Sequence, residues 1–297
     1  MFPSRSHTIT LAAAFNDLGA QDPRVRVAAA DALGDVPEED RERAADSLSR
    51  ALRDDRFEVR CAAALALGDL GLAAPVPALV SCLDDAAAEV RQAAAIALGR
   101  IGDPAAFDPL LAALREGPPD LRFQAAISLA EIDSDRAYEP LVGALRDGDA
   151  EVRANAAAAL GLVGDRRAAG WLAELLGDPR ADTRFEAACA LAELEDQRAV
   201  EPLCWFLRNA GCAYRAIEAL ERVGDPSCIP HLADRMRRWL LARVLRIRAA
   251  GAVIAIAPAH EESVFARRLL ERAARARSEE VRGLAEELLA RLAGAVS

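Results

Sequence analysis

The chain has 297 residues, of which 53% are hydrophobic but only 4% aromatic, and its formal charge is −10. Abundant alanine favours helix, and this composition excludes both an all-β sandwich, which needs aromatic and β-branched residues, and a disordered chain. The excess of 47 acidic over 37 basic residues excludes general nucleic-acid binding, because phosphate contacts drive that affinity.

The N-terminal segment, residues 1–20, contains a short apolar run from Ile9 to Phe15. This run lacks the length of a signal peptide, and no window approaches the apolar length of a membrane-spanning helix. Six cysteines form no CxxC pair and several stand in alanine-rich helical runs. Buried free thiols in a reducing compartment are therefore expected, which predicts a cytoplasmic protein.

An alanine-rich block that closes on leucine recurs through residues 20–230, mostly every 31 residues. The closing leucines are Leu33, Leu67, Leu98, Leu129, Leu160, Leu191 and Leu220. A fixed period of this length is a signature of stacked repeats. A single repeat cannot bury its own apolar faces, so its neighbours must supply the core.

Each repeat is predicted to contain two helices. In one repeat, Asp103 caps a first helix that Gly117–Pro119 ends, and a second helix starts near Leu121. The equivalent caps are Asp165, Asp196 and Asp225, with Ser134 once in their place. A proline six residues after the cap, at Pro109, Pro140 and Pro202, predicts bent first helices. Glycines near the ends of second helices are expected C-caps: Gly68, Gly71, Gly99, Gly102, Gly161 and Gly164.

The second helices begin with Val-Arg, continue through Ala-Ala and close on Ala-Leu-Gly, best seen in residues 59–68, 90–99 and 152–161. With the Asp caps and the first-helix prolines, this pattern resembles HEAT repeats of the phycobiliprotein-lyase HEAT-like (bilin-lyase-like) class. The resemblance implies an all-α fold, a right-handed α-solenoid or superhelix of about nine HEAT-like helix pairs. We expect one solenoid over residues 1–297, with degenerate, arginine-rich repeats and a cap in residues 231–297.

One arginine per repeat stands seven residues before the closing leucine, and an acid stands six residues before that arginine. The arginines are Arg60, Arg91, Arg122, Arg153 and Arg184, and the acids are Asp54, Asp85, Glu116, Asp147 and Asp178. Each guanidinium can reach a carboxylate of its own repeat or of a neighbour. We interpret this series, the arginine ladder, as structural rather than as an anion-binding stripe.

Residues for catalysis are scarce. Of three histidines, only His260 has an adjacent glutamate, Glu261, and one such pair cannot hold the two irons of enzymes resembling deoxyhypusine hydroxylase. No dinucleotide, P-loop or nucleophile-elbow motif occurs. We therefore expect no catalytic residues, no metal and no cofactor.

A helical wheel of the second helices places small, polar and acidic residues on a concave face for partner binding. The predicted set is Gln124, Ser128, Glu131, Asn155, Leu162, Glu186 and Glu193, with Leu162 as the apolar anchor. The alternative is a merely solvated face.

Charge is segregated, since residues 235–282 carry 12 arginines against five acids. Residues 235–246, including Trp239, are predicted to form a basic amphipathic helix whose Arg237, Arg238 and Arg243 make a secondary basic patch.

The sequence thus predicts a non-catalytic protein-binding solenoid, an adaptor, scaffold or regulator of a cytoplasmic assembly whose protein partner is not identified. One alternative is a bilin-lyase-like subunit that handles a phycobiliprotein chromophore. The other is a binder of an anionic surface through the arginine-rich repeats.

Overall fold

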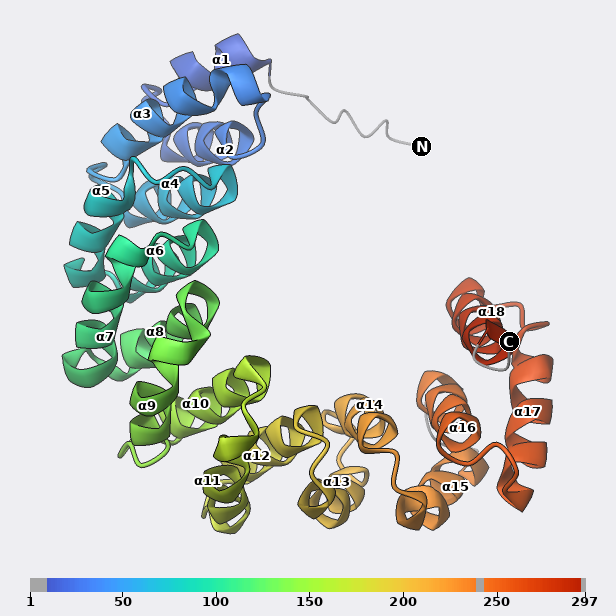
Figure 1. The fold of residues 1–297 in the computed structure, drawn as a ribbon. Helices are drawn as coiled ribbons and strands as arrows, with labels where there is room; N and C mark the ends of the chain where they lie inside the picture. The colour runs from blue at the N-terminus through green and yellow to red at the C-terminus, as the bar shows by residue number, and fades with distance from the viewer. Residues whose placement is uncertain (1–9, 239–242, 295–297) are drawn as a thin grey trace. The chain divides into compact units, whose positions relative to one another are not determined.

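The computed structural model describes residues 10–238 and 243–294, and all regular structure in them is helical (Figure 1). Eighteen α-helices follow one another in these residues as nine consecutive pairs, several of them joined by a 3-10 turn. Contacts divide the chain into two compact units, an N-terminal unit up to Ala159 and a C-terminal unit from Leu160. The expected single solenoid over 1–297 stays a prediction, and the all-helical solenoid architecture is confirmed.

The N-terminal unit has two layers of helices (Figure 1). Its first helices are α1 (Leu11–Asp17), α3 (Arg41–Ala51), α5 (Val76–Ser81), α7 (Phe107–Glu116) and α9 (Ser134–Ala144). Its second helices are α2 (Pro23–Leu33), α4 (Phe57–Leu70), α6 (Ala88–Ile101), α8 (Pro119–Ile132) and α10 (Ala150–Val163), in which the division between the units falls.

The C-terminal unit repeats this plan. Its first helices are α11 (Ala169–Glu174), α13 (Val200–Phe206), α15 (Ile229–Arg237) and α17 (Glu261–Ala273). Its second helices are α12 (Ala181–Glu193), α14 (Ala213–Val223), α16 (Arg243–Ile256) and α18 (Glu279–Gly294).

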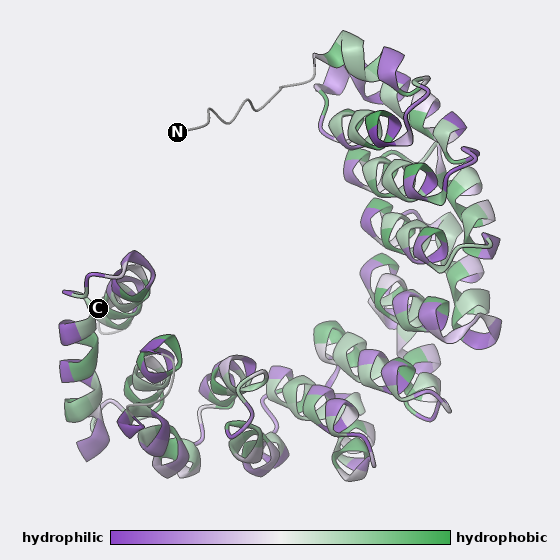
Figure 2. Ribbon diagram, turned by 180° about the vertical axis from the view of Figure 1, so that it is seen from behind, coloured by the Kyte–Doolittle hydropathy of each residue, from purple (hydrophilic) through white to green (hydrophobic). Residues whose placement is uncertain are grey.

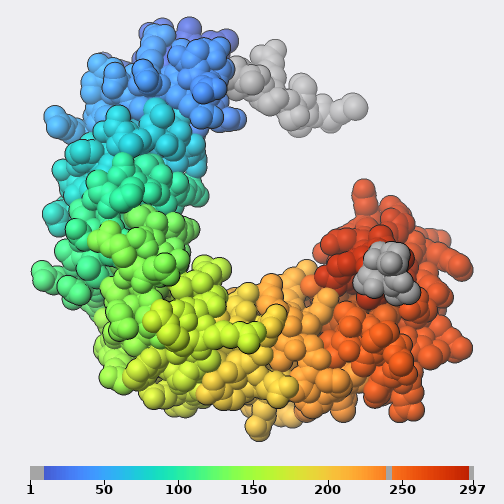
Figure 3. Space-filling view, viewed as in Figure 1, coloured from blue at the N-terminus to red at the C-terminus, as the bar shows by residue number. Residues whose placement is uncertain are grey.

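The core of each unit lies between its helices. All seven closing leucines are fully buried, and the alanines beside them, such as Ala63 and Ala94, leave room for close helix contact. Hydrophobic and hydrophilic turns share each helix in Figure 2, as expected for helices that bury one side. Consecutive repeats form consecutive bands in Figure 3, so within each unit the core is built between sequence neighbours.

Aspartate caps open the first helices, but most of them cap a 3-10 turn rather than an α-helix. The carboxylate of Asp103 accepts from the Ala105 amide ahead of Pro104–Ala106, and Asp165, Asp196 and Asp225 act in the same way. The prediction that Ser134 is a cap is wrong, because Asp133 accepts from the Arg136 amide.

The expected position of the proline inside the first helix is corrected in two of three repeats, whereas the bend stays a prediction. Pro109 and Pro202 are the third residues of α7 and α13, after the 3-10 turn, and only Pro140 lies beyond the first turn of its helix. In the first turn of a helix the missing N–H has no intrahelical acceptor to lose.

The repeated glycines have two different roles. Gly71, Gly102 and Gly164 end second helices with φ near +70°, as predicted for C-caps. Gly68, however, lies inside α4, and a Cβ there would stand 2.8 Å from the Cα of Ala97 on α6. Gly161 meets Ala190 of α12 at 2.9 Å in the same way, so the second helices approach each other at these glycines.

The predicted basic helix over residues 235–246 is not continuous. Helix α15 ends at Arg237, Arg238 is extended, and α16 begins at Arg243. Trp239, which was part of this prediction, lies outside the described residues.

Candidate functional site

The arginine ladder joins each repeat to the next in the N-terminal unit. The Nε and Nη2 atoms of Arg60 donate to the two carboxylate oxygens of Asp85, both at 2.8 Å. Its Nη1 donates at 2.9 Å to the carbonyl of Asp54, six residues earlier. Arg122 makes the same bidentate contact with both carboxylate oxygens of Asp147, at 2.9 Å. The carboxylate therefore comes from the following repeat, and the arginine's own repeat supplies a carbonyl.

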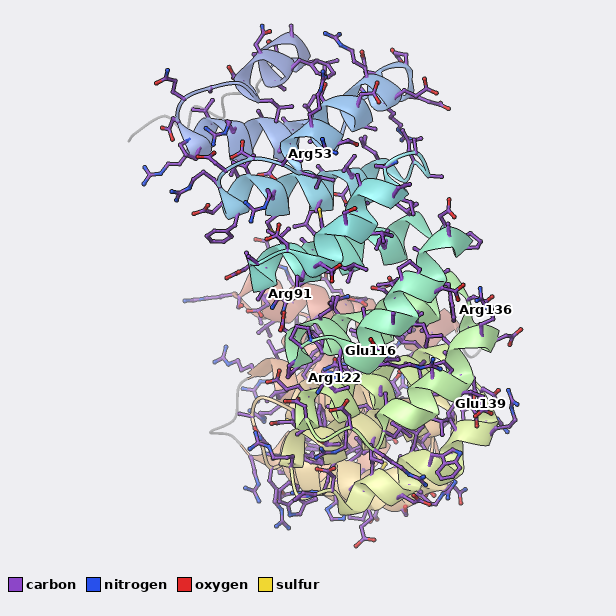
Figure 4. The ribbon with its side chains drawn as sticks, turned by 90° about the vertical axis from the view of Figure 1, so that its left-hand side faces the viewer. Arg53, Arg91, Glu116, Arg122, Arg136 and Glu139 are labelled. Carbon is purple, nitrogen blue, oxygen red and sulfur yellow. The ribbon has the colours of Figure 1, made fainter. Side chains whose placement is uncertain are left out.

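The ladder starts earlier in the chain than predicted, and one of its arginines binds a different acid from the one that the spacing suggests. Arg26 binds Asp54 and Asp55, so the series starts one repeat earlier. Arg91 pairs with Asp120 at 2.8 Å and not with Glu116. Figure 4 shows Arg91 and Arg122 on one side of the N-terminal unit, away from Arg136 and Glu139 of α9. Arg153 and Arg184 keep the carbonyl contact, to Asp147 and Asp178 respectively.

Burial and pairing set the electrostatics of the ladder. The paired side chains of Arg26, Arg60, Arg91 and Arg122 and their aspartates are only 11–25% exposed, Asp55 excepted. The hydrogen bond from Arg60 holds the pKa of Asp85 below its ordinary value against the opposing effect of burial. For Asp147, burial would raise the pKa, but the bonds from Arg122 and the Asp149 amide outweigh it and the pKa is lowered.

Four residues of the predicted partner-binding set fall in the N-terminal unit, and two of them are misplaced. Gln124 and Ser128 are buried, because α8 turns them toward α6. The Ser128 hydroxyl donates to the carbonyl of Ala95 at 2.9 Å and lies within hydrogen-bond distance of the Gln124 amide. Glu131 is exposed and Asn155 half-buried, its amide donating to the carbonyl of Glu151.

The other three residues fall in the C-terminal unit. Leu162 is 71% exposed, as an anchor requires. Glu186 and Glu193 are not free acids, because Arg215 binds both oxygens of Glu186 at 2.7 Å and Arg222 binds Glu193. The expected acidic stripe is therefore neutralised in this unit by arginines of the next repeat.

Three of these paired side chains, those of Glu193, Arg215 and Arg222, line a polar hollow on the second helices of the C-terminal unit, here called the paired recess. It has a volume of about 430 Å³. Its lining residues are Cys189, Glu193, Arg215, Glu218, Ala219, Glu221, Arg222, Arg248 and Arg291. Arg291 of α18 reaches Glu221 of α14 at 2.6 Å, and the nearly buried Arg248 of α16 contacts Glu218 and Glu221. Sequence reasoning missed the recess because its arginines follow no 31-residue interval.

The predicted basic patch is also partly neutralised. Arg237 binds Glu262 of α17 at 2.5 Å, and Arg238 binds Asp234 at 2.7 Å. Arg243 is exposed at the start of α16, within the described residues, and has no ion pair there.

The thiols offer little nucleophilic chemistry. All six cysteines are free, and burial raises the pKa of Cys189 and Cys228 to about 12 and that of Cys204 to about 11. Thiols with such pKa values are protonated at neutral pH, whereas a reactive cysteine needs a thiolate. Within residues 10–238 and 243–294, no group of three His, Cys, Asp or Glu residues is placed to hold a metal ion. In that same part of the chain, no helix combines the length and apolarity needed to cross a membrane.

Comparison with known proteins identifies the repeats. The family model described as HEAT repeats matches residues 10–99, 76–151, 139–211 and 169–253. No curated protein matches the chain by sequence.

Among solved structures, YibA of Escherichia coli is 20% identical, with a TM-score of 0.54 over 82% of this chain and 90% of that one. Yeast importin-β (Kap95p) is 14% identical, with a TM-score of 0.64 over 95% of this chain but only 46% of its own. The complex of CpcE and CpcF of phycocyanin lyase from Nostoc is 22% identical, with a TM-score of 0.47 over 91% of this chain and 97% of that one. At these identities the likeness is one of fold.

Proposed function

Because the chain belongs to the HEAT-repeat family, we propose that it is a non-catalytic scaffold or adaptor that binds a protein partner and regulates a cytoplasmic assembly. HEAT solenoids present extended surfaces on which contacts spread over several repeats. Six free cysteines support a reducing, cytoplasmic location.

The observation that carries the proposal is the paired recess. Four arginines from three helices are fixed there by glutamates of earlier repeats, through Arg215–Glu186, Arg222–Glu193, Arg248–Glu218 and Arg291–Glu221. Side chains that are already ordered lose less entropy when a partner binds. Arg215, Arg222 and Arg291 remain about half exposed, so their unused N–H groups can bind a partner's carbonyls and carboxylates.

The test is affinity capture followed by mass spectrometry with three forms of the full chain. The recess variant carries Arg222→Ala and Arg291→Ala. The control carries Arg166→Ala and Arg180→Ala, which remove the same charge from exposed surface pairs of the same unit. We expect a protein that the wild type and the control capture and the recess variant loses, with all three equally helical by circular dichroism. Equal capture by all three would contradict the recess as the binding surface.

The enzyme alternative has its own readout. No bilin-handling residue can be transferred to this sequence from the class it resembles. A captured partner incubated with the protein, with and without free bilin, should therefore keep its mass and its visible absorption. A covalent adduct on the partner would instead favour the bilin-lyase-like function.

A further inference from the structure

A second hollow in the C-terminal unit has the opposite electrostatic character to the paired recess. This hollow, the basic groove, lies where the start of α16, the end of α17 and the start of α18 meet, and its volume is about 730 Å³. Its charged lining is Arg243, Arg246, Arg268, Glu271, Arg272 and Arg275. Five arginines against one glutamate give the lining a net charge of +4. The groove and the paired recess share no lining residue.

The arginines of the basic groove converge because of helical spacing. Arg268 and Arg272 are four residues apart on α17, so they share one side of the helix, and Arg275 follows in the turn after it. Arg246 is held by its Nε bond of 2.8 Å to the carbonyl of Met236, which leaves its terminal N–H groups for another acceptor.

These arginines lack the partners that other arginines of the unit have. In the described part of the chain, none of Arg243, Arg268, Arg272 and Arg275 forms an ion pair, whereas Arg237, Arg248 and Arg291 nearby all do. Like charges gathered in one hollow repel one another, and an anionic ligand would remove that cost.

The floor of the groove is apolar. Ile247 and Val281 are buried, and Leu269 and Ala276 are half-buried beside the arginines. A small inorganic anion would leave this apolar surface unused. Among the residues that the structure describes, no aromatic side chain lines the groove, so these residues offer no platform for stacking a nucleobase. A membrane surface is flat, whereas these arginines line a recess.

We propose that the basic groove binds an acidic peptide segment of a protein partner, one that alternates carboxylates with aliphatic side chains. The guanidinium groups bind the carboxylates in bidentate fashion, and the aliphatic side chains cover the half-buried Leu269 and Ala276. This site differs from the proposed recess, so either can fail while the other stands.

The test is fluorescence anisotropy of a fluorescein-labelled peptide that repeats Glu-Glu-Leu, titrated with the full chain at low salt. The groove variant carries Arg268→Glu and Arg272→Glu. The control carries Arg267→Glu and Arg277→Glu, which reverse two exposed arginines of the same region that do not line the groove. We expect the groove variant to bind at least about tenfold more weakly than the wild type, and the control to bind within about twofold of it.

Two further probes distinguish other ligands. The same peptide with Gln in place of Glu should not bind, because the guanidinium groups of the groove need carboxylates as partners. Phosphatidylserine vesicles are tested by co-sedimentation with the same variants. The proposal is overturned if the wild type does not bind the acidic peptide, or if both variants bind it equally. It is also overturned if the wild type binds the vesicles but not the peptide, and the groove variant loses that vesicle binding. Circular dichroism of both variants is the check that they are folded.

Discussion

At the scale of single residues, a ladder guanidinium serves two repeats at once. Arg122 gives two N–H groups to Asp147 of the next repeat and a third to the carbonyl of Gly117, at 2.8 Å, in its own. Only arginine has this planar fork, and a lysine would supply a single point of charge. The side chain therefore fixes the spacing of the two repeats as well as their charge balance.

Removing one ladder arginine should cost more stability than removing a surface arginine. Arg122→Ala leaves the partly buried Asp147 without its main partner, and we expect the free energy of unfolding to fall by about 1–3 kcal/mol. Arg100→Ala breaks an exposed pair with Asp69 in the same unit and should change it by about 0.5 kcal/mol or less. Urea denaturation followed by circular dichroism measures both, and equal losses would contradict a structural ladder.

The ladder also predicts how stability depends on pH. The folded-state pKa values of Asp85 and Asp147 are lowered, so their contribution is complete above the ordinary aspartate pKa of about 3.9 and is lost as pH falls through the folded values. The melting temperature should therefore drop below about pH 4. A variant with Asp85→Asn and Asp147→Asn should melt lower at pH 7 but show a shallower drop in acid. If the melting temperatures of the two proteins fell in parallel as the pH was lowered, these carboxylates would not contribute to the pH dependence of stability.

Sequence reasoning reached the ladder's arginines and most of its acids, but not which acid binds which arginine. The interval that places Asp85 six residues before Arg91 also places it in the repeat after Arg60, so spacing alone cannot choose between the two. Gln124 and Ser128 were misplaced because a helical wheel does not say which side of α8 packs on α6. Glu186 and Glu193 were read as free acids because a helical wheel of one repeat does not show the next, in which their arginine partners stand 29 residues away.

At the scale of the element, glycine is needed near the end of a second helix for two different reasons. Gly71 takes a left-handed conformation with φ of 68°, and Gly68 leaves space for the backbone of α6. Both stand near the end of α4, which is why the sequence suggested one role for both. The 3-10 turns before α7 and α13 were missed for a similar reason, since an aspartate cap opens either kind of helix.

Glycine-to-alanine substitutions test this distinction. Gly68→Ala places a Cβ 2.8 Å from the Ala97 Cα, and we expect a loss of about 1–3 kcal/mol from overpacking. Gly143→Ala, in α9, meets no atom within 4 Å, and we expect a gain of about 0.5–1 kcal/mol from helix propensity. Urea denaturation of the two variants should therefore give shifts of opposite sign. A stabilising Gly68→Ala would mean that the helices are not in close contact there.

At the scale of the whole molecule, the period predicted stacked helix pairs correctly because one buried leucine and one second helix recur in seven of the nine described pairs. The recess and the groove were not predictable, because each is made where three or more helices meet, and each includes residues of the degenerate repeats. Their arginines follow no interval, and only the packed structure shows which of them are paired.

A local change should stay local in such a chain. Contacts in a stacked-repeat protein join sequence neighbours, so Arg60→Ala should speed amide hydrogen exchange in α4 and α6 while leaving α14 and α16 unchanged. Hydrogen exchange with mass spectrometry resolves these helices. Equal acceleration throughout both units would mean that the chain unfolds as one cooperative body.

The direction of the ladder contacts has a consequence for how such a chain can grow. Each middle repeat of the N-terminal unit contributes a carboxylate to the repeat before it and a guanidinium toward the repeat after it. Duplicating or deleting one complete repeat would therefore leave each remaining guanidinium facing a carboxylate. An insertion of half a repeat would leave one charged side chain without its partner on each side of the new junction. The ladder thus makes the whole repeat the smallest unit of length that evolution or protein engineering can add without a penalty.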